Sequence, residues 1–157
     1  MDLCNEEKNQ KFNPIDVIRL KNAGININLE NFKLNPLTKK YDYEGSLDLS
    51  GKGLSEIPVK FGKVTGNFNC YDNPLASLQG CPQEVCGNFN CSCNLLTSLD
   101  YAPEYVGRNF NCYKNLISDI STIPTKYIGG DFYARGENNT FEITDELRKI
   151  VKGDIYK

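Results

Sequence analysis

The middle of the chain is built from a repeat with a step of 21 residues, and this feature constrains the fold more than any other. Three copies align as GNFNCYDNPLASL from Gly66, GNFNCSCNLLTSL from Gly87 and RNFNCYKNLISDI from Arg108. A degenerate copy precedes them around Leu47, and a fading copy follows at Phe132. A unit this short cannot bury an apolar face by itself, so we expect the copies to stack into a solenoid.

Within each copy, the alternation of apolar and polar residues predicts one short strand. In the first regular copy, Phe68 and Cys70 are expected to point inward, and Leu75 and Leu78 fill the interior behind the strand. A Pro followed by Val or Ile then carries a return segment that is too short and too Pro-broken for a long helix. The predicted core anchors of the three copies are Phe68, Cys70, Phe89, Cys91, Phe110 and Cys112.

An asparagine follows each predicted strand, three residues after the inward cysteine, where the chain turns. A side-chain amide both donates and accepts, so stacked amides here would satisfy buried peptide groups of the neighbouring repeat. Asn73, Asn94 and Asn115 are therefore predicted to form a structural ladder. The first, degenerate copy has Lys52 at this position, which indicates that it belongs with the N-terminal cap.

These residues resemble the signature of the leucine-rich repeat family, L-x-x-L-x-L-x-x-N-x-L, written here as F-x-C-x-x-N-x-L-x-x-L. The short unit with a Pro in its return segment looks like the bacterial-effector class of these repeats. The fuller motif G-N-F-x-C-x-x-N-x-L-x-S-L resembles repeat proteins of bacteriophages and other large DNA viruses. The resemblance implies an α/β solenoid with a parallel β-sheet on its concave face. It does not identify a partner, because such repeats bind unrelated partners.

The two ends of the chain have the pattern of helical caps. Asn13-Pro14 before an amphipathic run, with Gly24 after it, predicts a helix within an N-terminal cap over residues 1–44. Residues 45–141 hold about five coils, three of them regular, and Thr144 opens a capping helix in residues 142–157. Caps are expected because they stop open sheet edges from pairing. The alternative for residues 1–44 is a separate effector module, although they contain few apolar residues for a core.

The strand residues that point outward would form one exposed face, which in leucine-rich repeats is the concave, partner-binding surface. Here that face is two asparagine columns edged by tyrosines, which suit hydrogen bonding and rigid contact. Asp72 and Lys114 share a repeat position and place opposite charges along one edge. The alternative is that the asparagines only keep an exposed sheet soluble. The predicted partner-binding residues are Asp48, Asn67, Asn69, Tyr71, Asp72, Asn88, Asn90, Asn109, Asn111, Tyr113, Lys114, Asp131 and Tyr133.

Other kinds of site find little support in the sequence. The chain has no histidine, which removes His-based catalytic dyads and metal ligands, and its net charge of −2 argues against a nucleic-acid groove or a grip on anionic lipid. Cys91 repeats the inward Cys70, and Cys91-x-Cys93 lacks the C-x₂-C spacing of zinc sites. The periodic glycines lack a phosphate-loop motif, and the carboxylates form no inward pair. We therefore expect no catalytic residue, no metal and no cofactor.

The expected compartment follows from the start of the chain and from its cysteines. No stretch approaches the roughly 20 apolar residues of a membrane span, and the charged start lacks a secretory apolar region. Seven cysteines, an odd number without an export signal, predict reduced thiols in the cytoplasm.

The predicted function is a non-enzymatic module that binds another protein through the concave face. The viral resemblance implies a host-directed role, such as blocking or sequestering a host or defence protein in the host cytoplasm. Two alternatives remain open. One is a structural or assembly component that acts by self-association, and the other is a carbohydrate-binding module, because Asn and Tyr also suit sugars.

Overall fold

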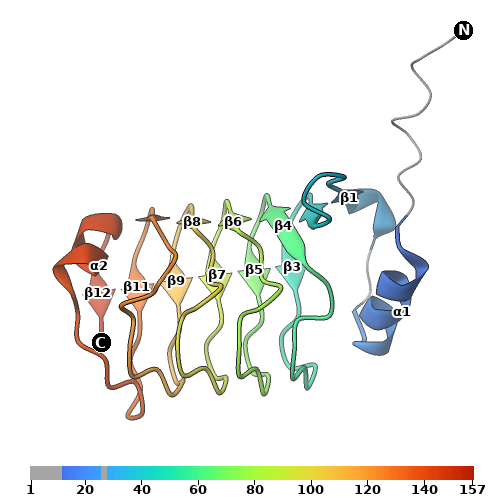
Figure 1. Ribbon diagram of the computed structural model, residues 1–157. Coiled ribbons are helices and arrows are strands. Elements are labelled where there is room, and N and C mark those ends of the chain that lie inside the picture. Colours follow the sequence, from blue (N-terminus) through green and yellow to red (C-terminus); the bar gives the residue numbers. More distant parts are fainter. Residues whose placement is uncertain (1–11, 26–27) are drawn as a thin grey trace, which may run out of the picture.

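The computed structural model describes residues 12–25 and 28–157, and it is a β-solenoid whose successive coils stack side by side (Figure 1). A coil here means one full turn of the solenoid. Each regular coil contributes one short strand to each of two sheets. Sheet A has the strand order β1-β2-β4-β6-β8-β10, and sheet B has the order β3-β5-β7-β9-β11-β12. All neighbouring strands are parallel except β1 and β2, which form an antiparallel hairpin.

The strands are short, and most contain two residues. Sheet A consists of β1 (Phe32–Leu34), β2 (Tyr41–Tyr43), β4 (Phe61–Val64), β6 (Glu84–Val85), β8 (Tyr105–Val106) and β10 (Tyr127–Ile128). Sheet B consists of β3 (Leu47–Asp48), β5 (Phe68–Asn69), β7 (Phe89–Asn90), β9 (Phe110–Asn111), β11 (Phe132–Tyr133) and β12 (Ile155–Tyr156). The helices are α1 (Pro14–Asn22), the 3₁₀ helix η1 (Leu29–Asn31) and α2 (Asp145–Ile150).

The register between coils turns the sequence repeat into columns of equivalent side chains. Phe68 pairs with Phe89, and Phe89 pairs with Phe110, so residues one repeat apart lie side by side on neighbouring strands. Parallel strands lie about 4.8 Å apart. Each repeat position therefore forms a row of side chains along the solenoid with that spacing. Rows that point inward form the core, and rows that point outward form the surface.

The core is a row of phenylalanines flanked by cysteines and aliphatic side chains. The row runs from Phe68 to Phe132 with ring centroids of successive members 5.0 to 5.9 Å apart, and Phe61 of sheet A packs on its first ring at 5.7 Å. The side chains of Cys70, Cys91 and Cys112 have no exposed surface. The inward core anchors of the regular copies, all fully buried, are Phe68, Cys70, Phe89, Cys91, Phe110 and Cys112.

Sheet A is the main difference from the expectation of a single sheet. The return segments form its strands, with Val85, Val106 and Ile128 fully buried and Tyr105 exposed on the outward side. Strands of two residues are too short to leave a visible alternation in the sequence. Within the described residues, no helix lies between 45 and 141, so the coils are β-solenoid coils rather than strand–helix units.

The N-terminal end is covered by α1 and then by the β1–β2 hairpin (Figure 1). Asn13 caps α1 through its side-chain oxygen, and Leu20 buries the inner face of the helix. The Tyr41 hydroxyl donates to Asp16 Oδ2 at 2.7 Å, which ties β2 to α1, and burial together with this carboxylate raises the pKa of Tyr41 to about 12. Because β2 pairs with β4, sheet A already begins inside the segment expected to be a helical cap. Residues 1–11 and 26–27 of that expected cap lie outside the described residues.

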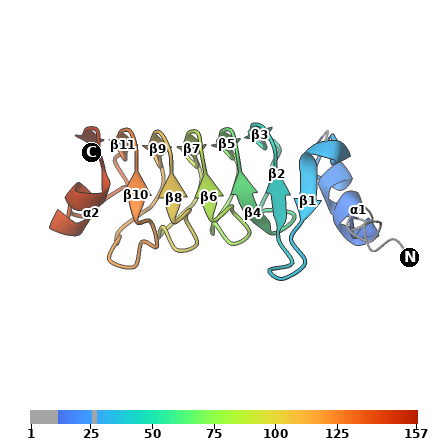
Figure 2. The same cartoon turned by 90° about the horizontal axis from the view of Figure 1, so that it is seen from above.

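The C-terminal end combines a helix with a last strand (Figure 2). Thr144 caps α2 by accepting the Leu147 N–H, and Leu147 is buried against the last coil. After the helix, β12 pairs in parallel with β11 and becomes the terminal strand of sheet B. Residues 142–157, expected to hold a capping helix, therefore extend the solenoid by a further strand.

Candidate functional site

Most of the predicted site residues gather on the outward side of sheet B, which we call the sheet B face, whereas Asp72 and Lys114 lie in the turns that follow its strands. The coils run in a nearly straight row, so this face is close to flat rather than concave (Figure 2). Three columns cross it, one before the strands, one within them and one after them. The first column is Ser46, Asn67, Asn88, Asn109 and Asp131; the second is Asp48, Asn69, Asn90, Asn111 and Tyr133; the third is Ser50, Tyr71, Ser92, Tyr113 and Arg135.

The first column is a ladder on the outside of the solenoid. Asn67 Oδ1 accepts the Asn88 N–H at 2.8 Å, and Asn88 Oδ1 accepts the Asn109 N–H at 3.0 Å. The same contact continues from Asn109 to the Asp131 N–H and from Asp131 to the Asp154 N–H. These side chains therefore hold successive coils together. The sequence had predicted a partner-binding role for them and not this structural one.

The outer ladder leaves little space for a side chain at the glycine that precedes most of its members, although the β9 coil has Arg108 at this position. The Asn67 carboxamide oxygen occupies the space that a side chain on Gly87 would need, and the Gly66 carbonyl carbon lies 2.8 Å from that position. Gly66, Gly130 and Gly153 face the equivalent oxygens of their preceding coils. The Gly-Asn pair is thus one structural unit shared between two coils.

The second column makes local turns. The Oδ1 atoms of Asn69, Asn90 and Asn111 accept the N–H two residues later, at 3.1, 3.1 and 3.0 Å. A backbone N–H can only donate, so these bonds fix which way each carboxamide points. The carboxamide oxygens of both columns are therefore used inside the chain.

Unlike these oxygens, most amide nitrogens of the two columns have no hydrogen-bond acceptor among the described residues. Asn69 Nδ2 donates to Asp48 Oδ1 at 3.1 Å. The Nδ2 groups with no acceptor among the described residues are those of Asn67, Asn88, Asn90, Asn109 and Asn111. The centre of the sheet B face is consequently rich in unpaired N–H donors, with carboxylates of Asp48 and Asp131 toward its ends.

Two tyrosines border this face in the third column. Tyr71 is 42% exposed and Tyr113 is 36% exposed, while Ser92 between them is buried and donates to Asn90 Oδ1. Lys114 Nζ lies 5.1 Å from the centre of the Tyr113 ring. The neighbouring Cys93 thiol and Asp72 carboxylate raise the pKa of Tyr71.

Tyr133 is placed differently from the other two predicted tyrosines. Its ring stacks on Tyr156 at 4.9 Å, and its hydroxyl donates to Asp131 Oδ2 at 2.8 Å. That hydrogen bond raises the pKa of Tyr133. Tyr133 therefore belongs to the C-terminal end of the face and is partly covered.

The inner asparagines lie in the turn that follows each sheet B strand. Asn94 is 5% exposed; its Nδ2 donates to Cys70, Cys91 and Ser92 carbonyls, and its Oδ1 accepts the Leu75 N–H. Asn73 and Asn115 make the equivalent bonds, both within their own coil and to the coil before it.

Sequence reasoning missed a fourth member of the inner ladder. Asn139 accepts the Ile117 N–H and donates to the Cys112 carbonyl. It lies 24 residues after Asn115, whereas the 22-residue step of this coil puts Glu137 at the equivalent position. The polar run G-E-N-N at 136–139 is the only sequence signal that points to it.

The cysteines do not converge on a ligand. Cys70, Cys91 and Cys112 form a buried column, and burial raises the pKa of the Cys91 and Cys112 thiols. A buried thiol with a raised pKa is a poor nucleophile. Over residues 12–25 and 28–157, no group of three or more Cys, Asp or Glu side chains is arranged to hold a metal ion.

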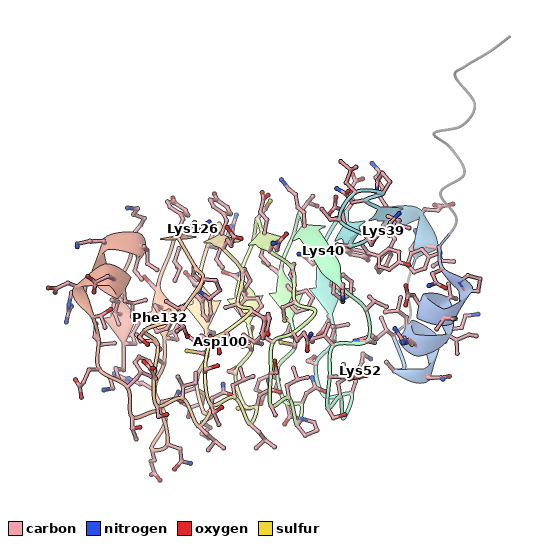
Figure 3. All side chains as sticks on the ribbon, viewed as in Figure 1. Lys39, Lys40, Lys52, Asp100, Lys126 and Phe132 are labelled. Atoms are coloured by element: carbon pink, nitrogen blue, oxygen red, sulfur yellow. The ribbon has the colours of Figure 1, made fainter. Side chains whose placement is uncertain are left out.

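A hollow of about 650 Å³ lies away from the sheet B face, between α1 and the first coils. Asp16, Arg19, Lys39, Glu56 and Lys60 are among its lining residues, so it carries both signs of charge. Figure 3 shows Lys39 and Lys40 near the N-terminal end of the solenoid and Lys126 near the other end. These cations are spread along the molecule and do not form one basic patch.

Comparison of the chain with protein-family models, with curated proteins and with solved structures gives no match. Among the described helices, none has the length and apolar character needed to cross a membrane.

Proposed function

We propose that the protein is a non-enzymatic interaction module that binds a partner protein through the sheet B face and its tyrosine edge. The observation that carries the proposal is the exposed pair Tyr71 and Tyr113, at 42% and 36% exposure, on coils two steps apart. Two coil steps amount to about 10 Å. Tyrosine is favoured at binding hot spots because it offers a large amphipathic surface with little side-chain entropy to lose.

The asparagine columns give the proposed face a chemical preference. Their oxygens are occupied by backbone N–H groups, whereas five of their amide nitrogens have no acceptor among the described residues. A partner segment that offers carbonyl or carboxylate oxygens suits such a donor-rich face. Because backbone bonds already fix the carboxamides, little conformational entropy is lost when they bind. The proposal includes no catalytic step, metal or cofactor.

We extend the proposal to the finer class and setting implied by the sequence. The chain belongs, on this view, with the short leucine-rich repeats of bacteriophages and large DNA viruses, with helical caps, and it blocks or sequesters a host or defence protein in the host cytoplasm. The shared sequence motif supports membership of this repeat class. The strongest support within the motif is its asparagine, because Asn94 bonds backbone groups of the neighbouring coil. The free thiols support a reducing compartment.

The carbohydrate-binding alternative draws less support from the aromatic side chains. Tyr133 stacks on Tyr156 at 4.9 Å, and Tyr105 stacks on Tyr127 at 5.0 Å. Rings that cover one another present less open surface to a sugar ring.

Affinity capture from host lysate tests the proposal with three baits: wild type, a Tyr71→Ala/Tyr113→Ala variant and a Tyr105→Ala/Tyr127→Ala variant. The last is a matched control, because it also removes two tyrosines but from the outward side of sheet A. We expect one protein to be retained by wild type and by the control and lost by the Tyr71/Tyr113 variant. Equal retention by all three baits, or no retained protein, contradicts the proposal.

A further inference from the structure

The chain leaves sheet B through a tight turn in every coil, and the turns line up as a ridge along the solenoid. We define the turn ridge as the side chains on either side of the buried ladder asparagine in the three regular coils. They are Asp72, Pro74, Cys93, Leu95, Lys114 and Leu116. Asp72, Cys93 and Lys114 share a left-handed backbone, with φ of 56°, 53° and 49°, so the three turns have the same shape.

One row of the turn ridge is apolar and exposed. Leu95 is 50% exposed and Leu116 is 41% exposed, and Pro74 precedes them in the same repeat position and is also exposed. The backbone bonds Leu95 N–H to Leu75 carbonyl and Leu116 N–H to Leu96 carbonyl hold these residues at the same place in successive coils. Three apolar side chains in adjacent coils form a continuous stripe rather than scattered single residues.

The other row of the turn ridge carries opposite charges placed evenly about its centre. Asp72 lies one coil before Cys93, and Lys114 lies one coil after it. Both are exposed, and neither forms an ion pair with another described residue. Reversing the direction of the ridge therefore exchanges the positions of the two charges.

We propose that a second copy of the protein covers the turn ridge, in an antiparallel dimer whose two-fold axis passes beside Cys93. A two-fold interface brings the same patch of both subunits together, so the patch must be complementary to itself. In this arrangement Asp72 faces Lys114 of the other copy twice, Leu95 faces Leu95, and Pro74 faces Leu116. The turn ridge meets this condition in both of its rows.

The antiparallel direction follows from the charges. A parallel arrangement would place Asp72 against Asp72 and Lys114 against Lys114, and like charges in contact are unfavourable. On the outer coils the same turn position holds Gly51 and Gly136, neither of which carries a side-chain charge. The antiparallel dimer sets these two against each other and adds no pair of like charges there.

The contact is narrow, because it uses one edge of the molecule and leaves both sheet faces open. Interfaces below about 1,200 Å² are typical of weak and transient complexes. We therefore expect a dimer that forms reversibly at concentrations of about 10 μM to 1 mM, and that weakens at higher ionic strength.

Sedimentation equilibrium of wild type, Asp72→Lys, Lys114→Asp and an equimolar mixture of the two variants tests the dimer. We expect wild type to dimerise and each variant alone to dimerise at least tenfold more weakly, because each brings like charges together. The mixture should regain dimers, because each lysine then faces an aspartate of the other variant. Lys33→Asp on β1, the same charge change far along the chain from the turn ridge, should dimerise like wild type.

Each other outcome overturns the proposal. A wild type that stays monomeric at about 1 mM, variants that dimerise like wild type, or a mixture that stays monomeric would each do so. Recovery in the mixture also shows that both variants are folded. The inference does not depend on the proposed function, because sedimentation equilibrium measures the dimer in the absence of any partner protein. A monomeric wild type that still captures a partner refutes the dimer alone.

Discussion

Asn94 Nδ2 lies 3.0 Å from the carbonyl oxygen of Cys70, one coil earlier, and donates a hydrogen bond to it across the interior turn. The same amide also donates to the Cys91 carbonyl in its own coil, while its Oδ1 accepts the Leu75 N–H. One side chain thereby satisfies backbone groups in two coils at a site with 5% exposure. The asparagine of the repeat is a cross-link between coils, which is why it recurs with the strand.

Replacing this cross-link should weaken the fold. Asn94→Leu is expected to lower the free energy of unfolding by about 1–3 kcal/mol, because buried backbone groups of two coils lose their partners. Urea unfolding followed by circular dichroism measures the change. Asn138→Leu, at an exposed position next to Asn139, serves as the control and should change stability little. An unfolding midpoint for Asn94→Leu equal to that of wild type would reject this role.

Two neighbouring cysteines should respond differently to the same substitution. Cys91 is fully buried in the cysteine column, so Cys91→Ser brings a hydroxyl into an apolar site and should cost about 1–3 kcal/mol. Cys93 lies partly exposed in the turn, and Cys93→Ser should stay within about 0.5 kcal/mol of wild type. Thermal unfolding of both variants compares them directly. The reverse order of stability would mean that the inward phase of the strands is shifted by one residue.

A side chain at Gly87 should disturb the contact between two coils. Gly87→Ala is expected to destabilise the protein by about 1–3 kcal/mol, because the added methyl group meets Asn67 Oδ1 and the Gly66 backbone. In an Asn67→Ala background the cost should fall, since one of the two obstacles is gone. Urea unfolding of the four proteins of this double-mutant cycle gives the coupling. Strictly additive effects would show that the outer ladder and the glycine do not share the space.

The stacked solenoid could be predicted because the copies of the repeat align in the sequence at a constant step of 21 residues. The inward rows could be assigned from alternation, as for Phe68 and Cys70. Sheet A was not predicted, because Glu84–Val85 and Tyr105–Val106 are two-residue strands formed only when neighbouring coils supply partners. Tertiary pairing, rather than local preference, decides such strands.

The surface was harder to assign than the core. Asn67 and Asn69 are alike in the sequence, yet one bonds the next coil and the other bonds its own turn. Their different roles depend on where the neighbouring backbone N–H groups lie, which a single repeat does not reveal. Only the stacked coils show that both carboxamide oxygens accept hydrogen bonds from backbone N–H groups of the chain itself.

Acid should destabilise the fold partly through Asp131. Its carboxylate accepts the Asp154 N–H and the Tyr133 hydroxyl, and these bonds lower the pKa of Asp131 below its unfolded value of about 3.9. A lowered folded pKa adds stability that is present above about pH 4 and is lost as the pH falls through the folded pKa. Asp131→Asn keeps the acceptor for Asp154, as in the asparagines of the other coils, but cannot titrate. Urea midpoints between about pH 2 and pH 4 should therefore depend less steeply on pH in this variant. An unchanged slope would exclude this contribution.

The binding role of the tyrosine edge is the central claim, and the dissociation constant of the captured partner tests it most directly. Isothermal titration calorimetry would compare wild type with the Tyr71→Ala/Tyr113→Ala and Tyr105→Ala/Tyr127→Ala variants. We predict at least about 30-fold weaker binding for the first variant, equivalent to about 2 kcal/mol, and no more than about a twofold change for the second. Equal affinity for all three proteins, or a larger loss from the sheet A pair, would contradict binding through the sheet B face.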